Sequence, residues 1–138
     1  MIFLAVFEVS AAEPKAAEAA TVAANNAVLT QLPFSDNRSF EDARRGFVAA
    51  LPDGLIAGGG ERPVWNMGAY DFLSEEQAPA TVNPSLWRQA RLNAIHGLFK
   101  VVDGMYQIRG MDLSNMTIIE GETGLIVIDP LLTPATAK

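Results

Sequence analysis

The sequence contains no cysteine and a single histidine, His96, among its 138 residues. The absence of cysteine excludes disulfides, thiolate-ligated zinc, iron–sulfur clusters and thiol catalysis. Zinc hydrolase centres need two or three imidazoles, because these neutral ligands hold the ion while it stays Lewis-acidic. A lone histidine cannot supply them, and no G-x-S-x-G nucleophile elbow accompanies it. We therefore predict no metal ligand and no catalytic residue within this chain.

Basic residues are also few. Ten Lys and Arg face 16 Asp and Glu, for a formal net charge of -6. No basic cluster gives the electrostatic footprint of a nucleic-acid-binding protein, so no nucleic-acid partner is predicted. The apolar run at residues 2–7 is too short to cross a bilayer, so no membrane span is predicted. Residues 1–20 are interpreted as a shortened export signal and linker, which favours a periplasmic or secreted protein; an ordinary disordered terminus is the alternative.

The first patterns along the chain are those of helices. Residues 21–97 are predicted to form a helical N-terminal segment, with a first helix over 21–32 that ends before Pro33. A second helix is predicted to begin at Ser39 and continue to Leu51. A third opens at Asn83, where an N-cap asparagine is followed by proline at the first helical position, and is expected to end at Gly97.

After Gly97 the apolar pattern changes to a period of two, which predicts strands. The expected strands cover residues 98–102, 105–109, 115–120 and 125–128, in a meander that occupies the predicted domain 98–138. The run 125–128 is apolar on both faces, as is typical of a central strand covered on both sides. Such a strand needs a second layer, which the last eight residues, 131–138, cannot supply, so the chain is predicted to stop inside a domain.

Several short motifs occur together in a specific order. In chain order they are QLPFSD (31–36), FEDA (40–43), RGF (45–47), ATVNPSLWRQA (80–90), IHGLF (95–99), GMYQIRG (104–110), DLSNMT (112–117) and GLIVIDP (124–130). This series resembles the N-terminal part of the bacterial alkylsulfatases that degrade sulfate-ester surfactants such as SDS. The resemblance runs from about residue 21 to the end of the sequence.

The resemblance implies an α/β (α+β) fold in which the helical segment precedes the truncated start of a metallo-β-lactamase αββα sandwich. It also implies two zinc ions in the full-length protein, held by an H-x-H-x-D-H motif that is absent from this sequence. Alkyl sulfate would be hydrolysed to alcohol and sulfate, and a homodimer would form through a domain absent here. We expect this fragment by itself to bind no zinc and to be inactive.

Two residues are the site candidates that the resemblance suggests. In metallo-β-lactamase folds an acidic residue at the end of the strand 125–128 commonly lies just below the metals, so Asp129 is predicted to orient a ligand. Asn115 begins a strand near the expected cleft rim, where its amide could donate to a sulfate oxygen. The structural alternatives are a turn-forming aspartate before proline and a strand-initiating asparagine. Weaker rim candidates are Tyr106, Arg109 and Asp112.

Other side chains have competing interpretations. The aromatic residues Trp65, Tyr70, Phe72 and Trp87 could line an alkyl-chain pocket, but aromatics at this spacing are more often core. His96, at the end of the third helix, is expected to contact backbone carbonyls rather than a metal.

Two further functions remain open from the sequence. The first is another metallo-β-lactamase-fold hydrolase, acting on a lactam, a thioester or a phosphoester. The second is a non-catalytic binding module.

Overall fold

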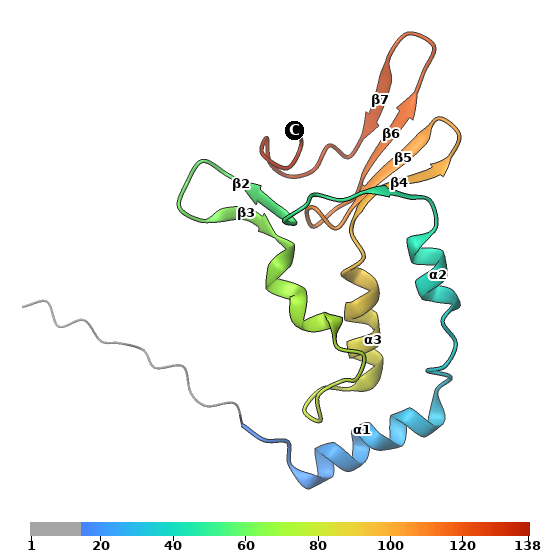
Figure 1. Cartoon of the computed structure of the whole chain (residues 1–138), viewed down its shortest axis with the longest axis vertical. Coiled ribbons are helices and arrows are strands. Elements are labelled where there is room, and N and C mark those ends of the chain that lie inside the picture. Colours follow the sequence, from blue (N-terminus) through green and yellow to red (C-terminus); the bar gives the residue numbers. More distant parts are fainter. Residues whose placement is uncertain (1–14) are drawn as a thin grey trace, which may run out of the picture.

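A computed structural model describes residues 15–138, and Figure 1 shows helices at one end and a sheet at the other. The prediction of an export signal falls mainly on residues 1–14, outside the described residues. None of the helices within residues 15–138 is long and apolar enough to cross a membrane. The elements, in chain order, are α1 (Ala19–Gln31), α2 (Arg38–Arg44), β1 (Phe47–Ala49), β2 (Leu55–Ala57), β3 (Pro63–Asn66), the 3-10 helix η1 (Met67–Ser74), α3 (Pro84–Asn93), β4 (Gly97–Val102), β5 (Met105–Arg109), β6 (Met116–Glu120) and β7 (Leu125–Ile128).

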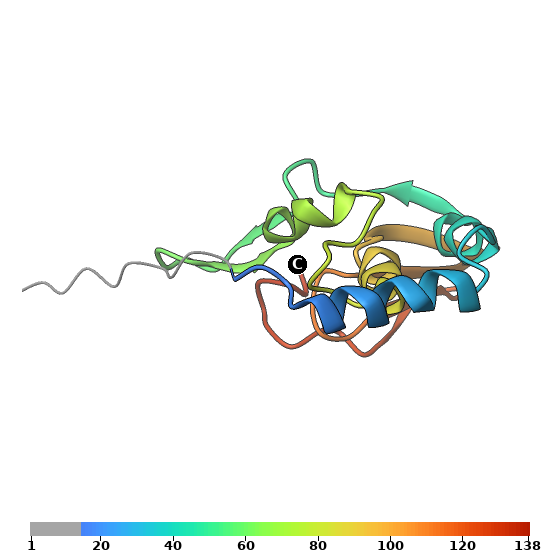
Figure 2. The ribbon, with the colours of Figure 1, turned by 90° about the horizontal axis from the view of Figure 1, so that it is seen from below.

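Helices α1 and α3 confirm two of the predicted helices. At the start of α3 the Asn83 side chain accepts a hydrogen bond from the Ser85 backbone N–H at 2.9 Å, with Pro84 in the first turn. Helix α1 runs across the lower end of α3 in Figure 1 and lies in front of it when seen from below in Figure 2, and the two helices are in contact. Asn25 of α1 reinforces this packing by donating from its side chain to the Ala80 carbonyl at 2.9 Å, in the segment that leads into α3.

The expected end of α3 at Gly97 is wrong, because the helix stops at Asn93. Gly97 has a φ of 132° and opens β4 instead. A Cβ atom at this position would lie 2.4 Å from the Ala49 carbonyl oxygen. The glycine is therefore required by the close approach of β1 to β4, and not by the end of a helix.

The predicted second helix is also wrong in both bounds. It begins at Arg38 rather than at Ser39, and it ends at Arg44, so that Phe47–Ala49 forms strand β1. Gly46 separates the two elements with a φ of 73°, a left-handed conformation that ends the helix. Phe47 then pairs with Phe99 of β4, and its ring meets the Phe99 ring edge-on at 5.6 Å between centroids.

The main sheet has five antiparallel strands in the order β1-β4-β5-β6-β7, and β2 and β3 form a separate hairpin. The four strands predicted after residue 97 are confirmed, including the hairpin turn between Val102 and Met105. The mixture of helices and antiparallel sheet confirms the α+β class. The full αββα sandwich remains a prediction, as does the domain boundary at 97/98, across which β1 pairs with β4.

The position of β7 bears on the expectation of a central strand covered on both sides. It is an edge strand of this sheet with exposed side chains, so residues 15–138 supply no such cover, and the covered strand stays a prediction. Figure 1 shows the β6–β7 hairpin projecting away from the helices. The core lies instead between the base of the sheet and the helices, and its buried hydrophobic side chains are Phe40, Met67, Trp87, Phe99, Met111 and Met116.

Candidate functional site

An apolar hollow of about 870 Å³ lies where β3 and η1 meet α3 and the segment between β5 and β6. Aromatic side chains from these elements form much of its wall. They are Trp65, Tyr70, Phe72 and Trp87, the same four that the sequence singled out. The structure therefore brings the four aromatics to one place, although they come from three separate elements of the chain.

Two tryptophans fix the wall of this hollow. Trp65 donates from its indole N–H to the Gly110 carbonyl at 2.8 Å and so ties β3 to the end of β5. Trp87 is buried and donates to the Glu75 carbonyl at 3.1 Å. Buried indoles usually find such a partner, since an unpaired N–H is costly. Trp87 thus belongs to the core, whereas Tyr70 and Phe72 remain exposed at the mouth.

Polar groups line the same hollow from the last residue of β5 and the segment that follows it. Arg109, Asp112 and Asn115 all line it. The guanidinium of Arg109 lies over the Phe99 ring at 4.5 Å, and its Nε donates to the Gln107 side chain at 2.6 Å, so its position is fixed. Asn115 is exposed at the rim. Tyr106, the remaining rim candidate, lies within β5, opposite Lys100 of β4 and Ile118 of β6.

Asp129 directly follows β7, and its carboxylate accepts a hydrogen bond from the Ser114 hydroxyl at 3.2 Å. Ser114 is adjacent to Asn115, so the structure brings the two predicted site residues to the same end of the paired strands β6 and β7. Asp129 and Leu131 have φ angles of 54° and 71°. A left-handed backbone is uncommon for non-glycine residues and is unfavourable for leucine. Such conformations cluster at functional sites, which makes this turn a candidate for one.

Asp112 has a structural role that sequence reasoning missed. Its carboxylate accepts from the Leu132 backbone N–H at 2.9 Å, from the Thr136 hydroxyl at 2.8 Å and from the Leu113 N–H at 2.6 Å. Thr133 and Thr136 cap one another, because the backbone N–H of each donates to the other's hydroxyl oxygen. Proline at the second position of a turn is a common turn signal, so the turn that Thr133 and Pro134 open was detectable from sequence.

These hydrogen bonds predict that the stability of the segment 131–137 depends on pH. The Leu132 N–H, aided by Leu113 and Thr136, lowers the pKa of Asp112, while burial opposes them. A carboxyl group with a lowered pKa in the folded state stabilises the fold at pH values above its unfolded pKa, about 3.9. That stabilisation is lost as the pH falls below this value and through the folded pKa. We expect the amide signals of Leu132 and Thr136 to titrate together in an NMR series run from neutral to strongly acidic pH.

The matched variant is Asp112→Asn. It should weaken the same segment at neutral pH by about 1 kcal/mol and remove the titration, because the amide cannot replace both acceptor oxygens. Unchanged Leu132 and Thr136 signals throughout the acid titration of the wild type would contradict this role.

The zinc ions implied by the resemblance do not fit the residues present. Residues 15–138 contain no group of three or more His, Cys, Asp or Glu side chains that could hold a metal ion. His96 has its Nδ1 atom 2.9 Å from the Ala94 carbonyl, so the ring contacts the backbone at the end of α3. A metal-dependent step would therefore need ligands from outside residues 15–138.

Comparisons with known proteins identify relatives, although no family model matches the chain. It is 56% identical over 124 residues to the alkyl/aryl-sulfatase BDS1 of Saccharomyces cerevisiae, covering 90% of this chain. It is 52% identical to a linear primary-alkylsulfatase and to an (R)-specific secondary-alkylsulfatase, both of Pseudomonas sp., with coverage of 90% and 91%.

A solved structure of an alkylsulfatase also matches this chain. The chain superposes on the stereoselective inverting sec-alkylsulfatase Pisa1 of Pseudomonas sp. with a TM-score of 0.84 and 53% identity, over 91% of this chain and 20% of Pisa1. The chain spans about a fifth of the length of the curated relatives it matches. The similarity inferred from the ordered motifs is thus confirmed: this chain is a homologue of the alkylsulfatases over a segment that makes up about one fifth of those proteins.

Proposed function

We propose that this chain contributes to an enzyme that hydrolyses alkyl sulfate esters to an alcohol and inorganic sulfate. The observation that carries the proposal is the 52–56% identity to relatives named alkylsulfatases, over about 90% of the chain. The superposition on Pisa1 supports it, because the helices and the sheet follow the same path. In this proposal the described segment supplies scaffold and part of the rim of a substrate cleft.

Two residues have proposed roles at that rim. Asn115 borders the apolar hollow, so an ester with its alkyl part against Phe72 and Tyr70 could receive a hydrogen bond from the Asn115 amide at a sulfate oxygen. Asp129 is proposed to orient a group of the metal site, in line with its strained backbone and its exposure at the end of β7.

The proposal extends to the whole protein in four respects. Two zinc ions would supply an activated water and neutralise charge on the sulfate, with ligands outside residues 15–138. The complete fold would be a metallo-β-lactamase sandwich. The protein would be a homodimer through a region outside this segment, and it would be exported to the periplasm or the medium.

The test is a chimera, in which this chain replaces the matching segment of a full-length enzyme. The matching segment of the (R)-specific secondary-alkylsulfatase is replaced by this chain, and sulfate release from a secondary alkyl sulfate is measured. At 52% identity we expect activity within about tenfold of the parent, since the backbone is retained. A chimera that folds but has no sulfatase activity would contradict the proposal. The isolated chain, assayed in parallel with zinc, should release no sulfate.

A substitution in the chimera tests the proposed role of the rim residue Asn115. Asn115→Ala should lower kcat/KM by about tenfold or more, because a lost donor to a developing negative charge weakens transition-state binding. Asn66→Ala, an exposed asparagine at the end of β3, is the matched control and should leave the rate unchanged. Equal rates for the two variants would remove Asn115 from the proposed site.

A further inference from the structure

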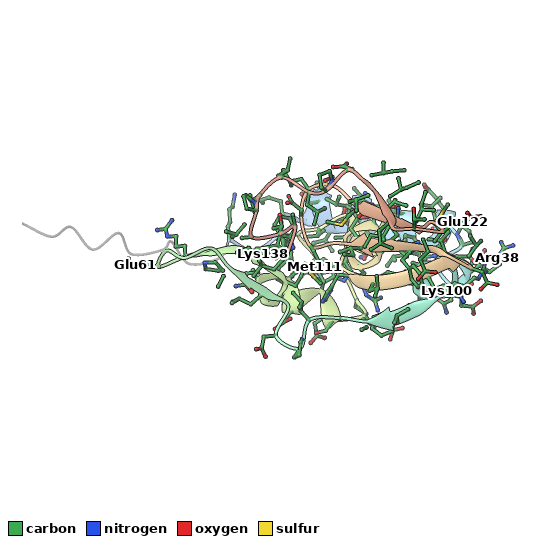
Figure 3. All side chains as sticks on the ribbon, turned by 90° about the horizontal axis from the view of Figure 1, so that it is seen from above. Arg38, Glu61, Lys100, Met111, Glu122 and Lys138 are labelled. Atoms are coloured by element: carbon green, nitrogen blue, oxygen red, sulfur yellow. The ribbon has the colours of Figure 1, made fainter. Side chains whose placement is uncertain are left out.

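A second cavity, of about 350 Å³, lies where the α1–α2 connection and the start of α2 meet α3. Figure 1 shows this connection beside α3, between α1 and the sheet. In Figure 3, Arg38 at the start of α2 lies at one end of the molecule and Glu61 of the β2–β3 hairpin lies at the other. The cavity and the aromatic hollow share a single lining residue, Leu92 of α3. They are therefore two separate places for a ligand.

The walls of this cavity are of two kinds. The apolar wall consists of Leu32, Pro33, Phe34 and Leu92. The polar wall consists of Ser39, Asp36, Ser85, Arg88 and Gln89. Small-molecule sites usually combine apolar walls with a few polar groups, in volumes of about 300–1,000 Å³. The cavity is near the lower end of that range, so its walls suit a small ligand with one polar and one apolar part.

Positive charge gathers beside the polar wall. The guanidinium carbons of Arg44, Arg88 and Arg91 lie 5.6, 4.8 and 5.3 Å from the centre of the buried Phe40 ring. None of the three side chains forms a salt bridge within residues 15–138. The ring attracts each cation, but the three like charges around it repel one another. A bound anion would offset this repulsion.

Arg88 connects the arginine cluster to the cavity. It lines the cavity, and one of its terminal nitrogens donates to the Asp36 carbonyl at 2.6 Å. A guanidinium has five N–H donors, so others are available to a ligand. The acidic side chain in the cavity wall, Asp36, is already paired with Arg38, whose Nε donates to its carboxylate at 2.9 Å. The charge of Asp36 is thereby compensated, and the polar wall favours an anion.

We propose that this cavity is a second ligand site, which binds a small organic oxyanion: a sulfate, sulfonate or carboxylate head on a short apolar chain. The head accepts hydrogen bonds from the Arg88 guanidinium, which suits oxyanions because of its planar fork of donors, and from the hydroxyls of Ser39 and Ser85. The chain lies against the apolar wall. No bond is made or broken at this site, so the inference concerns binding and does not depend on the proposed hydrolysis.

The probes are hexanesulfonate, hexanoate, inorganic sulfate and hexanol. Each is titrated into the full chain, and the amide signals of Ser39, Ser85 and Gln89 are followed by NMR. We expect at least one of the first two to shift these signals with half-saturation at about millimolar concentration, as befits a small ligand. The tighter of the two identifies the preferred head. Inorganic sulfate lacks the chain and hexanol lacks the charge, so each should bind at least about tenfold more weakly. Equally tight binding of either would contradict the proposal.

Two substitutions test the polar wall with hexanesulfonate as the ligand. Gln89→Glu adds a carboxylate at an exposed position, where it leaves the core intact, and should weaken binding about fivefold or more by repulsion. Arg88→Gln removes the cation and should have an effect at least as large. Arg62→Gln is the matched control, since it removes the same charge from an exposed position in the β2–β3 loop, and should change the affinity by less than about twofold. Equal affinities of Gln89→Glu and Arg62→Gln would overturn the inference.

A second measurement uses the full-length chimera, and therefore does not depend on the folding of the chain alone. Hexanesulfonate has no ester bond to hydrolyse, so it is not consumed by an active enzyme. It should slow hydrogen exchange in peptides that cover residues 33–40 and 84–92, and Gln89→Glu should remove this protection. Protection confined to peptides around Asn115, at the rim of the hollow, would overturn the second site. A chimera that is protected at 33–40 and 84–92 and releases no sulfate would contradict the proposed function and leave this inference intact.

Discussion

Replacing Phe99 with alanine is expected to lower the free energy of unfolding by about 3–5 kcal/mol, the usual cost of removing a buried aromatic ring. Phe99 is the largest side chain that is fully buried in residues 15–138, with 0% exposure. Its ring contacts Phe47 of β1 and lies beneath the Arg109 guanidinium of β5. The substitution would therefore loosen three neighbouring strands at once.

The measurement is urea denaturation followed by the fluorescence of Trp65 and Trp87. Since small domains are stabilised by only about 5–15 kcal/mol, the variant should be largely unfolded at low urea. Phe72→Ala is the matched control, because it removes the same ring from a position that is 57% exposed. It should cost less than about 1 kcal/mol. Equal losses for the two variants would show that the core is not centred on Phe99.

The second large effect is expected at Gly46, between α2 and β1. A Cβ atom there would lie 2.0 Å from the Lys100 carbonyl oxygen, and the residue has a φ of 73°. Gly46→Ala therefore combines a backbone clash with a left-handed conformation that costs about 1–2 kcal/mol for an L-residue. We expect a total loss of about 3 kcal/mol and separation of β1 from β4.

Hydrogen exchange at Lys100 reports on this separation, because its N–H donates to the Gly46 carbonyl at 2.7 Å. In Gly46→Ala the Lys100 amide should exchange markedly faster. Gly60→Ala in the β2–β3 loop is the control, since a Cβ atom there meets nothing within 4 Å. It should change stability by less than about 0.5 kcal/mol. An unaltered Lys100 exchange rate in Gly46→Ala would mean that β1 adapts without leaving the sheet.

The sequence predicted correctly those elements whose hydrogen bonds join residues that are near one another in the chain. The Asn83-Pro84 start of α3 is one case, because both residues act on the first turn of their own helix. The β4–β5 and β6–β7 hairpins are another, since each pairs strands joined by a short turn. The order of short motifs was equally informative, because it identified the alkylsulfatase relatives that the comparisons confirm.

Elements that depend on distant partners were predicted less well. Phe47 fits the apolar face of a helix that starts near Ser39, yet it lies in β1 because β4 offers it a strand partner and the Phe99 ring. The site shows the same limitation. Asp112 could be noted only as a rim candidate, since its partners Leu132 and Thr136 lie 20 and 24 positions away.

The sequence by itself determined the α+β composition, the hairpins after Gly97, the relation to the alkylsulfatases and the lack of a histidine set for zinc. The tertiary structure decided that β1 completes the sheet, that four aromatics meet in one hollow, and that β7 is an open edge. The physical reason is the range of the interactions involved. Turns and caps act within a few residues, whereas strand order and burial depend on contacts between segments that only folding brings together.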